Sequence, residues 1–144
     1  MLREYKNILV AVDSSKNSEV AFNEAMRIAK ENNGSLYIAC IVNEIEVTYS
    51  SFAPSKILQQ EKEAVEVELL KKVHDADEFG IAEITPIVEI GDPKHVISTV
   101  IPEQHAIDLI VIGATGKGAL QRAKVGTTTS YVVEHAPCNV LVVR

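Results

Sequence analysis

The sequence lacks several features whose absence excludes whole classes of protein. No apolar run approaches the roughly 20 residues that span a bilayer, so we expect no membrane segment and no membrane partner. The N-terminus leads directly into a strand-like segment, and no signal peptide is expected. Tryptophan is absent, and cysteine occurs only as Cys40 and Cys138. Both cysteines lie in apolar stretches without a CxxC spacing, which favours two buried thiols in a reducing cytoplasm over a disulfide or a redox pair.

Basic residues are also fewer than acidic residues in this chain. The chain has 14 Lys and Arg residues against 20 Asp and Glu residues, which gives a net charge of −6 at pH 7. A general nucleic-acid binder needs a basic face, so no nucleic acid is expected as a partner. The four histidines share no spacing that is typical of metal ligands, and the sequence therefore predicts no metal-ligating residues.

Linkers, low-complexity tracts and internal repeats are absent as well. A chain of 144 residues is large enough to bury a core of its own. We therefore expect a single domain that spans residues 1–144.

Short apolar runs alternate along the chain with segments of helical periodicity. Continuous apolar runs are typical of strands covered on both faces, and they occur at Ile8–Val12, Leu36–Val42, Ile84–Ile90, Asp108–Ile112 and Val140–Val143. Helices are expected between them, over residues 15–33, 54–80, 93–102 and 127–135. Residues 43–53 show neither period and are expected to form a loop. This alternation predicts an α/β fold with a parallel sheet and helices on both faces.

Two prolines refine this prediction. Pro86 lies near the start of the third apolar run and indicates an edge strand, because proline cannot donate a hydrogen bond to a sheet. Pro102 is expected to end or kink the helix that Asp92 caps and Pro93 begins.

Two strand ends are candidates for a ligand site. Ligands of open parallel sheets bind beyond the carboxyl ends of strands, where the strand order reverses. Asp13 follows the first predicted strand and Gly113 follows the fourth, so both lie where that rule places a ligand. Asp13 can orient a ribose hydroxyl or hold a metal ion through a phosphate. It can instead cap the following helix together with Ser14 or Ser15, and the sequence leaves both roles open.

A glycine-rich segment supplies the most specific functional signal. Gly113-Ala-Thr-Gly116 follows a buried strand, and after nine more residues Gly126-Thr127 opens a helix. A strand, a glycine turn and a helix start in this order commonly hold a phosphate with backbone N–H groups. Glycines in a loop can also serve only as turns.

The charges around this segment favour an anion. Residues 109–133 contain no Asp or Glu, whereas Lys117, Arg122 and Lys124 all lie within them. The local field is therefore positive in an acidic chain, although these cations can also be ordinary surface charges. The spacing is not that of a Walker A motif, because Gly118 follows the lysine where Ser or Thr would hold Mg²⁺. With no general base aimed at a γ-phosphate, the sequence favours nucleotide binding over catalysis.

Several motifs together resemble the universal stress protein family. They are the glycine pattern, the first strand ending in Val10-Ala-Val-Asp13-Ser-Ser, and the closing Pro137-Cys-Asn-Val-Leu-Val-Val143. The similarity covers the whole chain and implies a three-layer α/β/α sandwich of the Rossmann-like, adenine nucleotide alpha hydrolase-like type, with a five-stranded parallel sheet in the order 3-2-1-4-5. It also implies the subclass that binds ATP through the glycine motif, and hence a cytoplasmic, ATP-binding sensor or regulator of the stress response.

The resemblance implies a binding site residue by residue. Asp13 would lie beside the nucleoside, and the backbone of Ile41 and Val42 would meet the adenine. The ribose and phosphates of ATP, or of AMP or ADP in its place, would lie against the glycine motif, with Mg²⁺ or Mn²⁺ accompanying the phosphates. The complete predicted set is Ala11, Asp13, Ile41, Val42, Ile112, Gly113, Ala114, Gly116, Gly126, Thr127, Thr128 and Thr129.

Two positions depart from the family pattern. Ala114-Thr115 stand where members often carry Ser followed by a larger polar or basic residue, so that one side-chain donor is missing. Thr127 stands where Ser is frequent. Both changes keep the backbone cradle and can weaken the affinity for a triphosphate.

The last predicted strand, Val140–Val143, bears on assembly. An apolar strand at a sheet edge exposes backbone groups that pair with another strand, and the family pairs this strand with its copy in a second subunit. The resemblance therefore implies a homodimer, and an ordinary strand covered by its own helices is the alternative. A slow ATPase or phosphotransferase and a nucleotide-free interaction module are the competing functions.

Overall fold

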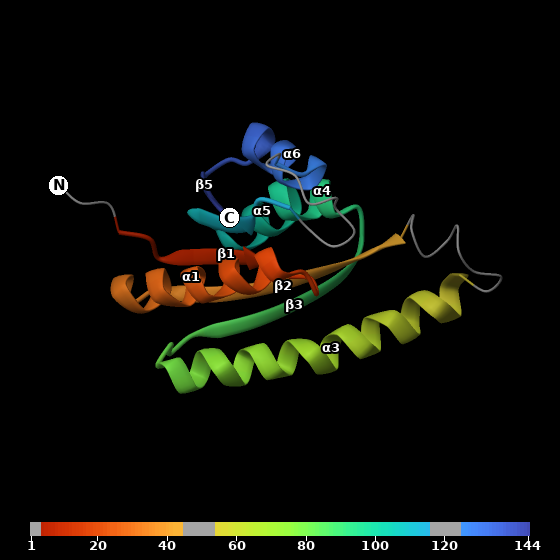
Figure 1. Cartoon of the computed structure of the whole chain (residues 1–144), viewed down its shortest axis with the longest axis horizontal. Coiled ribbons are helices and arrows are strands. Elements are labelled where there is room, and N and C mark those ends of the chain that lie inside the picture. Colours follow the sequence, from red (N-terminus) through yellow and green to blue (C-terminus); the bar gives the residue numbers. More distant parts are fainter. Residues whose placement is uncertain (1–3, 45–53, 116–124) are drawn as a thin grey trace.

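Five parallel strands form a single sheet in the order β3-β2-β1-β4-β5 (Figure 1). The computed structural model describes residues 4–44, 54–115 and 125–144. The strands are β1 Asn7–Ala11, β2 Ser35–Asn43, β3 Ile84–Gly91, β4 Leu109–Gly113 and β5 Asn139–Val143. The predicted fold class, the five strands and their order are confirmed. The loop expected over residues 43–53 lies almost entirely outside the described residues, and its first residue belongs to β2.

Helices cover both faces of the sheet (Figure 1). On one face lie α1 (Lys16–Asn32) and α3 (Pro54–Phe79), and on the other lie α4 (Pro93–His95), the π-helical turn η1 (Val96–Val100), α5 (Ile101–His105) and α6 (Thr127–His135). Successive strand residues point to opposite faces, so Ile8 and Val10 pack against α1 while Leu9 packs beneath η1 and α6. The central strands β1 and β4 are thus buried on both sides, as their continuous apolar runs indicate.

The ends of α1 and α3 are fixed by local chemistry. The Oγ of Ser15 accepts the backbone N–H of Ser18 and caps α1, which settles the choice that the sequence left between Ser14 and Ser15. Asn33 ends the helix in a left-handed conformation with φ 52°, a role that Asn and Gly favour. Gly80 follows α3 with φ 104°, which an L side chain adopts only under strain.

The helix expected to end or kink at Pro102 runs through that residue. Asp92 caps α4 by accepting the N–H of Lys94, at 3.2 Å, and the chain continues through η1 and α5 to Ala106, which is left-handed with φ 51°. Pro102 is the second residue of α5 and directly follows the π-helical turn, so the helix continues past it without the regular hydrogen bond that its missing N–H would make. The irregularity near this proline is therefore a π-helical turn, and the helical segment ends four residues later, at Ala106.

The two edges of the sheet differ in how they are protected. Pro86 lies in β3, which among the described strands pairs only with β2, so the predicted edge position is confirmed. Proline on an edge strand blocks pairing with a further strand. The other edge strand, β5, has no proline and no charged residue over Asn139–Val143. Its outer edge therefore offers backbone groups to a partner strand.

The two cysteines lie on opposite sides of the sheet. Cys40 packs with the α1 and α3 layer, and Cys138 packs with the layer of η1 and α6. Both are half-buried, and this placement excludes a disulfide between them. Burial, and secondarily the charge of Asp108, raises the pKa of the Cys138 thiol.

Among the described residues, none of the helices combines the length and the apolarity needed to cross a membrane.

Candidate functional site

The carboxyl ends of β1, β2 and β4 lie side by side at the same end of the sheet. The strand order reverses between β1 and β4, because β1 is followed by α1 on one face and β4 leads to α6 on the other (Figure 1). This is the switch point at which α/β sheets bind ligands. Asp13 and Gly113 both lie here, as the sequence predicts.

Asp13 is held in a tight loop between β1 and α1. Its backbone N–H donates to the Oγ of Ser18 at 2.8 Å, and its Oδ1 accepts the N–H of Ser15 at 2.7 Å. The hydroxyl of Ser18 donates in turn to the Asp13 carbonyl at 3.2 Å. The cap of α1 is thus Ser15, while Asp13 shapes the loop before it. These bonds place the Asp13 carboxylate at the mouth of the switch point, and its predicted contact with a nucleoside stays a prediction.

The first glycine of the motif allows α1 to lie close to the end of β4. Gly113 is buried, and a Cβ on it would lie 3.0 Å from the backbone C and O atoms of Asn17. The side-chain amide of Asn17 donates to the Oγ1 of Thr115 at 2.5 Å. Asn17 is a site residue that the sequence did not predict, because 98 positions separate it from Thr115.

The backbone of Gly113 and Ala114 is hydrogen-bonded to both β5 and the start of α6. The N–H of Ala114 donates to the carbonyl of Val143 at 2.8 Å, and the carbonyl of Ala114 accepts the N–H of Gly126 at 2.7 Å. The buried hydroxyl of Thr129, only 3% exposed, donates to the Gly113 carbonyl at 2.7 Å. Thr129 therefore directs its hydroxyl proton to the protein, and its predicted role toward a ligand stays untested.

The first turn of α6 provides backbone donors at this site. Gly126 caps the helix without a side chain, Thr127 is exposed and Thr128 is half-buried. Helix N-terminal N–H groups that lack intrahelical partners, together with the helix dipole, attract anions. The second glycine, Gly116, and the three cations predicted to lie nearby, Lys117, Arg122 and Lys124, fall outside the described residues.

The end of β2 forms a wall beside the switch point. Ala11 at the end of β1 is opposite Ala39, and β2 runs on to Asn43. The carbonyl of Ala39 accepts the N–H of Val12 at 2.8 Å, so by the alternation of a strand the backbone groups of Ile41 face the same side. Those of Val42 face β3 instead. The predicted residues of three neighbouring strands, Ala11, Asp13, Ile41, Val42, Ile112 and Gly113, therefore share one end of the sheet.

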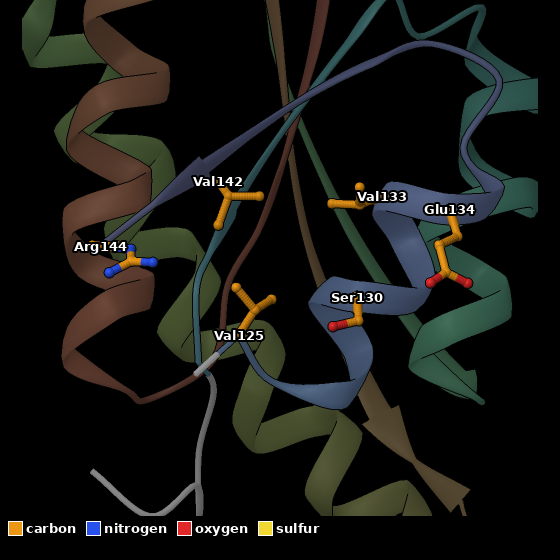
Figure 2. A pocket seen from close by; sticks show the side chains of 6 residues that line it. All are labelled: Val125, Ser130, Val133, Glu134, Val142 and Arg144. Atoms are coloured by element: carbon orange, nitrogen blue, oxygen red, sulfur yellow. The ribbon is translucent and has the colours of Figure 1, made fainter. Parts of the chain in front are cut away.

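Two surface hollows lie away from the Asp13 loop. The first measures about 410 Å³ and lies between α6 and the edge of β5; Figure 2 shows the residues around it, Val125, Ser130, Val133, Glu134, Val142 and Arg144. The second, about 350 Å³, lies between α3 and the edge of β3. Val125 precedes Gly126, so the first hollow adjoins the last glycine of the motif. Within the described part of the chain, no three His, Cys, Asp or Glu side chains gather as a metal site.

Comparison with known proteins gives consistent matches over the whole chain. The model of the Universal stress protein family matches residues 4–144. A putative universal stress protein of Staphylococcus haemolyticus is 39% identical over 142 residues, which cover 97% of this chain and 85% of that protein. The solved structure of the universal stress protein UspA from Lactobacillus plantarum matches with a TM-score of 0.88 and 36% identity, covering 99% of this chain and 100% of that one.

A more distant likeness concerns a protein solved with a nucleotide. The universal stress protein from Archaeoglobus fulgidus in complex with dAMP is 19% identical, with a TM-score of 0.68, and the match covers 99% of this chain and 100% of that one. At this identity the likeness shows the shared fold.

Proposed function

The chain belongs to the universal stress protein family, and from that premise we propose that it binds an adenine nucleotide, with ATP preferred, at the carboxyl ends of β1, β2 and β4. In this role it acts in the cytoplasm as a sensor or regulator of the stress response. The observation that carries the proposal is the convergence of the Asp13 loop, the turn that begins at Gly113 and the first turn of α6 at one switch point. The dAMP complex of the Archaeoglobus protein supports the choice of an adenine nucleotide.

Each part of the nucleotide has a matching group in this arrangement. The backbone of Ile41, which faces the β1 side, suits the edge of an adenine ring. The carboxylate of Asp13 suits a ribose hydroxyl, and the N–H groups at the start of α6 suit the phosphates. A Mg²⁺ or Mn²⁺ ion would arrive on the phosphates and keep most of its waters.

We expect isothermal titration calorimetry with ATP and Mg²⁺ to give a saturable signal with one site per chain. Bound nucleotide stabilises the folded state, by about 2.7 kcal/mol at a concentration 100 times the Kd, so the melting temperature should rise with the ATP concentration. The absence of both heat and a thermal shift at millimolar ATP would contradict the proposal.

Asp13→Asn is the sharpest variant for this titration. Asparagine keeps an oxygen for the Ser15 N–H, so the loop before α1 is preserved. A hydrogen bond to a charged group contributes about 1.5–3 kcal/mol, and the variant should bind ATP about tenfold or more weakly.

Ion-exchange chromatography of the nucleotide released from purified protein separates the competing functions. Intact ATP supports binding, and ADP or AMP indicates turnover.

We also propose that two copies of the chain pair through the outer edge of β5. Three observations support this assembly: β5 carries neither a proline nor a charge over Asn139–Val143, the opposite edge carries Pro86, and a hollow whose lining includes three valines lies beside β5 (Figure 2). Val133 on α6 is 51% exposed at this hollow. A second copy would cover it and extend the sheet across a two-fold axis.

Light scattering should give twice 15.7 kDa for the unmodified chain and a single chain mass for Val133→Glu. A charge buried between two copies is unfavourable, whereas Val67→Glu on α3 places the same charge at a site of similar exposure, 59%. This control should remain a dimer. If the unmodified chain is monomeric at micromolar concentration, the proposed assembly is wrong. If Val67→Glu alone dissociates the dimer, the interface lies on α3 instead.

A further inference from the structure

We propose that Asn17 is a positioning residue for the phosphate-binding turn. Its side-chain amide holds the hydroxyl of Thr115 and so orients both the hydroxyl and the backbone between the first two glycines. The inference rests on the proposed function, because it assigns a role at the same nucleotide site.

The contact joins two segments that are far apart in the sequence. Asn17 lies in the first turn of α1, and its Nδ2 donates to the Oγ1 of Thr115 at 2.5 Å. Gly113 lets the backbone of that same helical turn pack against the end of β4. The helix thus contacts the glycine turn through both its backbone and one side chain.

Thr115 would be the least supported residue of the described turn without this contact. The two residues before it are held by other partners: Thr129 binds the Gly113 carbonyl, while Val143 and Gly126 bind the backbone of Ala114. Asn17 extends this support by one residue, toward the second glycine. A phosphate cradle depends on N–H groups held in a fixed direction, so loosening this point should reduce phosphate affinity.

The direction of the hydrogen bond also determines what Thr115 can bind. A hydroxyl has one proton and two lone pairs. Because the Asn17 amide occupies a lone pair of Oγ1, the hydroxyl proton points away from Asn17 and can be donated to an oxygen ligand. Phosphate oxygens are acceptors. Thr115 thereby supplies the side-chain donor that the family pattern places one residue earlier and that Ala114 lacks.

The test compares ATP with adenosine, which has no phosphates. For Asn17→Ala we expect about a tenfold weaker affinity for ATP, equivalent to the loss of one hydrogen bond, and an unchanged affinity for adenosine. Asn23→Ala is the matched control, because Asn23 is exposed on the same helix and the substitution removes the same side-chain atoms. Calorimetry gives both affinities, and thermal melting shows whether the fold has changed.

Thr115 gives the same test from the other side of the contact. Thr115→Val keeps the shape of the side chain without the hydroxyl and should match Asn17→Ala, whereas Thr115→Ser should bind ATP as the unmodified chain does. The double variant Asn17→Ala with Thr115→Val should bind no more weakly than Thr115→Val alone, because the two groups act as a pair.

The outcomes separate this inference from the proposed function. Equal loss of ATP and adenosine affinity in Asn17→Ala, or an unchanged ATP affinity, would overturn the positioning role while leaving nucleotide binding in place. An unmodified chain that binds neither ATP nor adenosine would overturn the proposed function, and this inference with it.

Discussion

Gly113→Ala is expected to lower the free energy of unfolding by about 1–3 kcal/mol and to weaken ATP binding by about tenfold or more. The added methyl would lie 3.0 Å from three atoms of Asn17, two of them in the backbone. A helix backbone cannot move aside as the tip of a flexible side chain can, so α1 must shift as a unit. That shift would draw Asn17 away from Thr115 and displace the loop that holds Asp13.

Gly91→Ala is the control for this substitution. Gly91 also ends a strand of the sheet, but a Cβ there would lie 3.4 Å from the Cγ2 of Val96, which is an ordinary contact with a side chain. Its stability should change by no more than about 0.5 kcal/mol, and its ATP affinity should not change. Calorimetry and urea unfolding give the two quantities. If Gly113→Ala behaved like the control, the first glycine would serve only as a turn.

Phe22→Ala is expected to destabilise the chain by about 3–5 kcal/mol. Among the described residues, Phe22 of α1 has the largest fully buried side chain, at 1% exposure, and it packs in the cluster that joins α1, α3 and the sheet. The Nζ of Lys72 lies 4.9 Å from the centre of its ring, so the substitution also removes a cation–π contact that links α1 with α3. The cavity left in a close-packed core accounts for most of the loss.

Phe79→Ala isolates the contribution of burial. Phe79 also has a lysine over its ring, with the Nζ of Lys30 at 4.9 Å, but it is 39% exposed. Its loss should be about 1 kcal/mol, the size of an exposed cation–π contact. Urea unfolding of both variants, at one protein concentration so that any assembly contributes equally, gives the comparison. Equal losses would contradict the assignment of Phe22 to the core.

The sheet was predictable because its strands are covered on both faces. Ile8, Leu9 and Val10 are all fully buried, so the first strand appears in the sequence as an unbroken apolar run. Pro86 was informative for the same kind of reason, since a proline in a strand is tolerated chiefly at an edge. The π-helical turn before Pro102 was not predictable. A proline that only removes one N–H donor within a helix and a proline that ends the helix give the same pattern of apolar residues.

The candidate site divides in a similar way. The rule for strand ends and the glycine motif lead from the sequence to Asp13 and Gly113. Ser18 accepts the N–H of Asp13, while Val143 and Asn17 hydrogen-bond to Ala114 and Thr115, the two residues after Gly113. Nothing in the sequence around Ser18, Val143 or Asn17 marks these contacts. Such contacts depend on where α1 and β5 lie in three dimensions, which spacing along the chain does not report. For Thr129 the sequence predicts the position at a helix start but not the partner of the hydroxyl, which the structure shows to be the Gly113 carbonyl.

The hydrogen bond between Ala114 and Val143 has a practical consequence for work with this protein. Because all five strands are parallel, the last strand ends at the same side of the molecule as the proposed nucleotide site, and Arg144 lies beside the hollow next to α6 (Figure 2). An affinity tag or a surface attachment after Arg144 would crowd both the glycine turn and the edge of β5. The amino ends of the strands lie at the opposite end of the sheet, so immobilisation through the segment before β1 would leave the proposed site accessible.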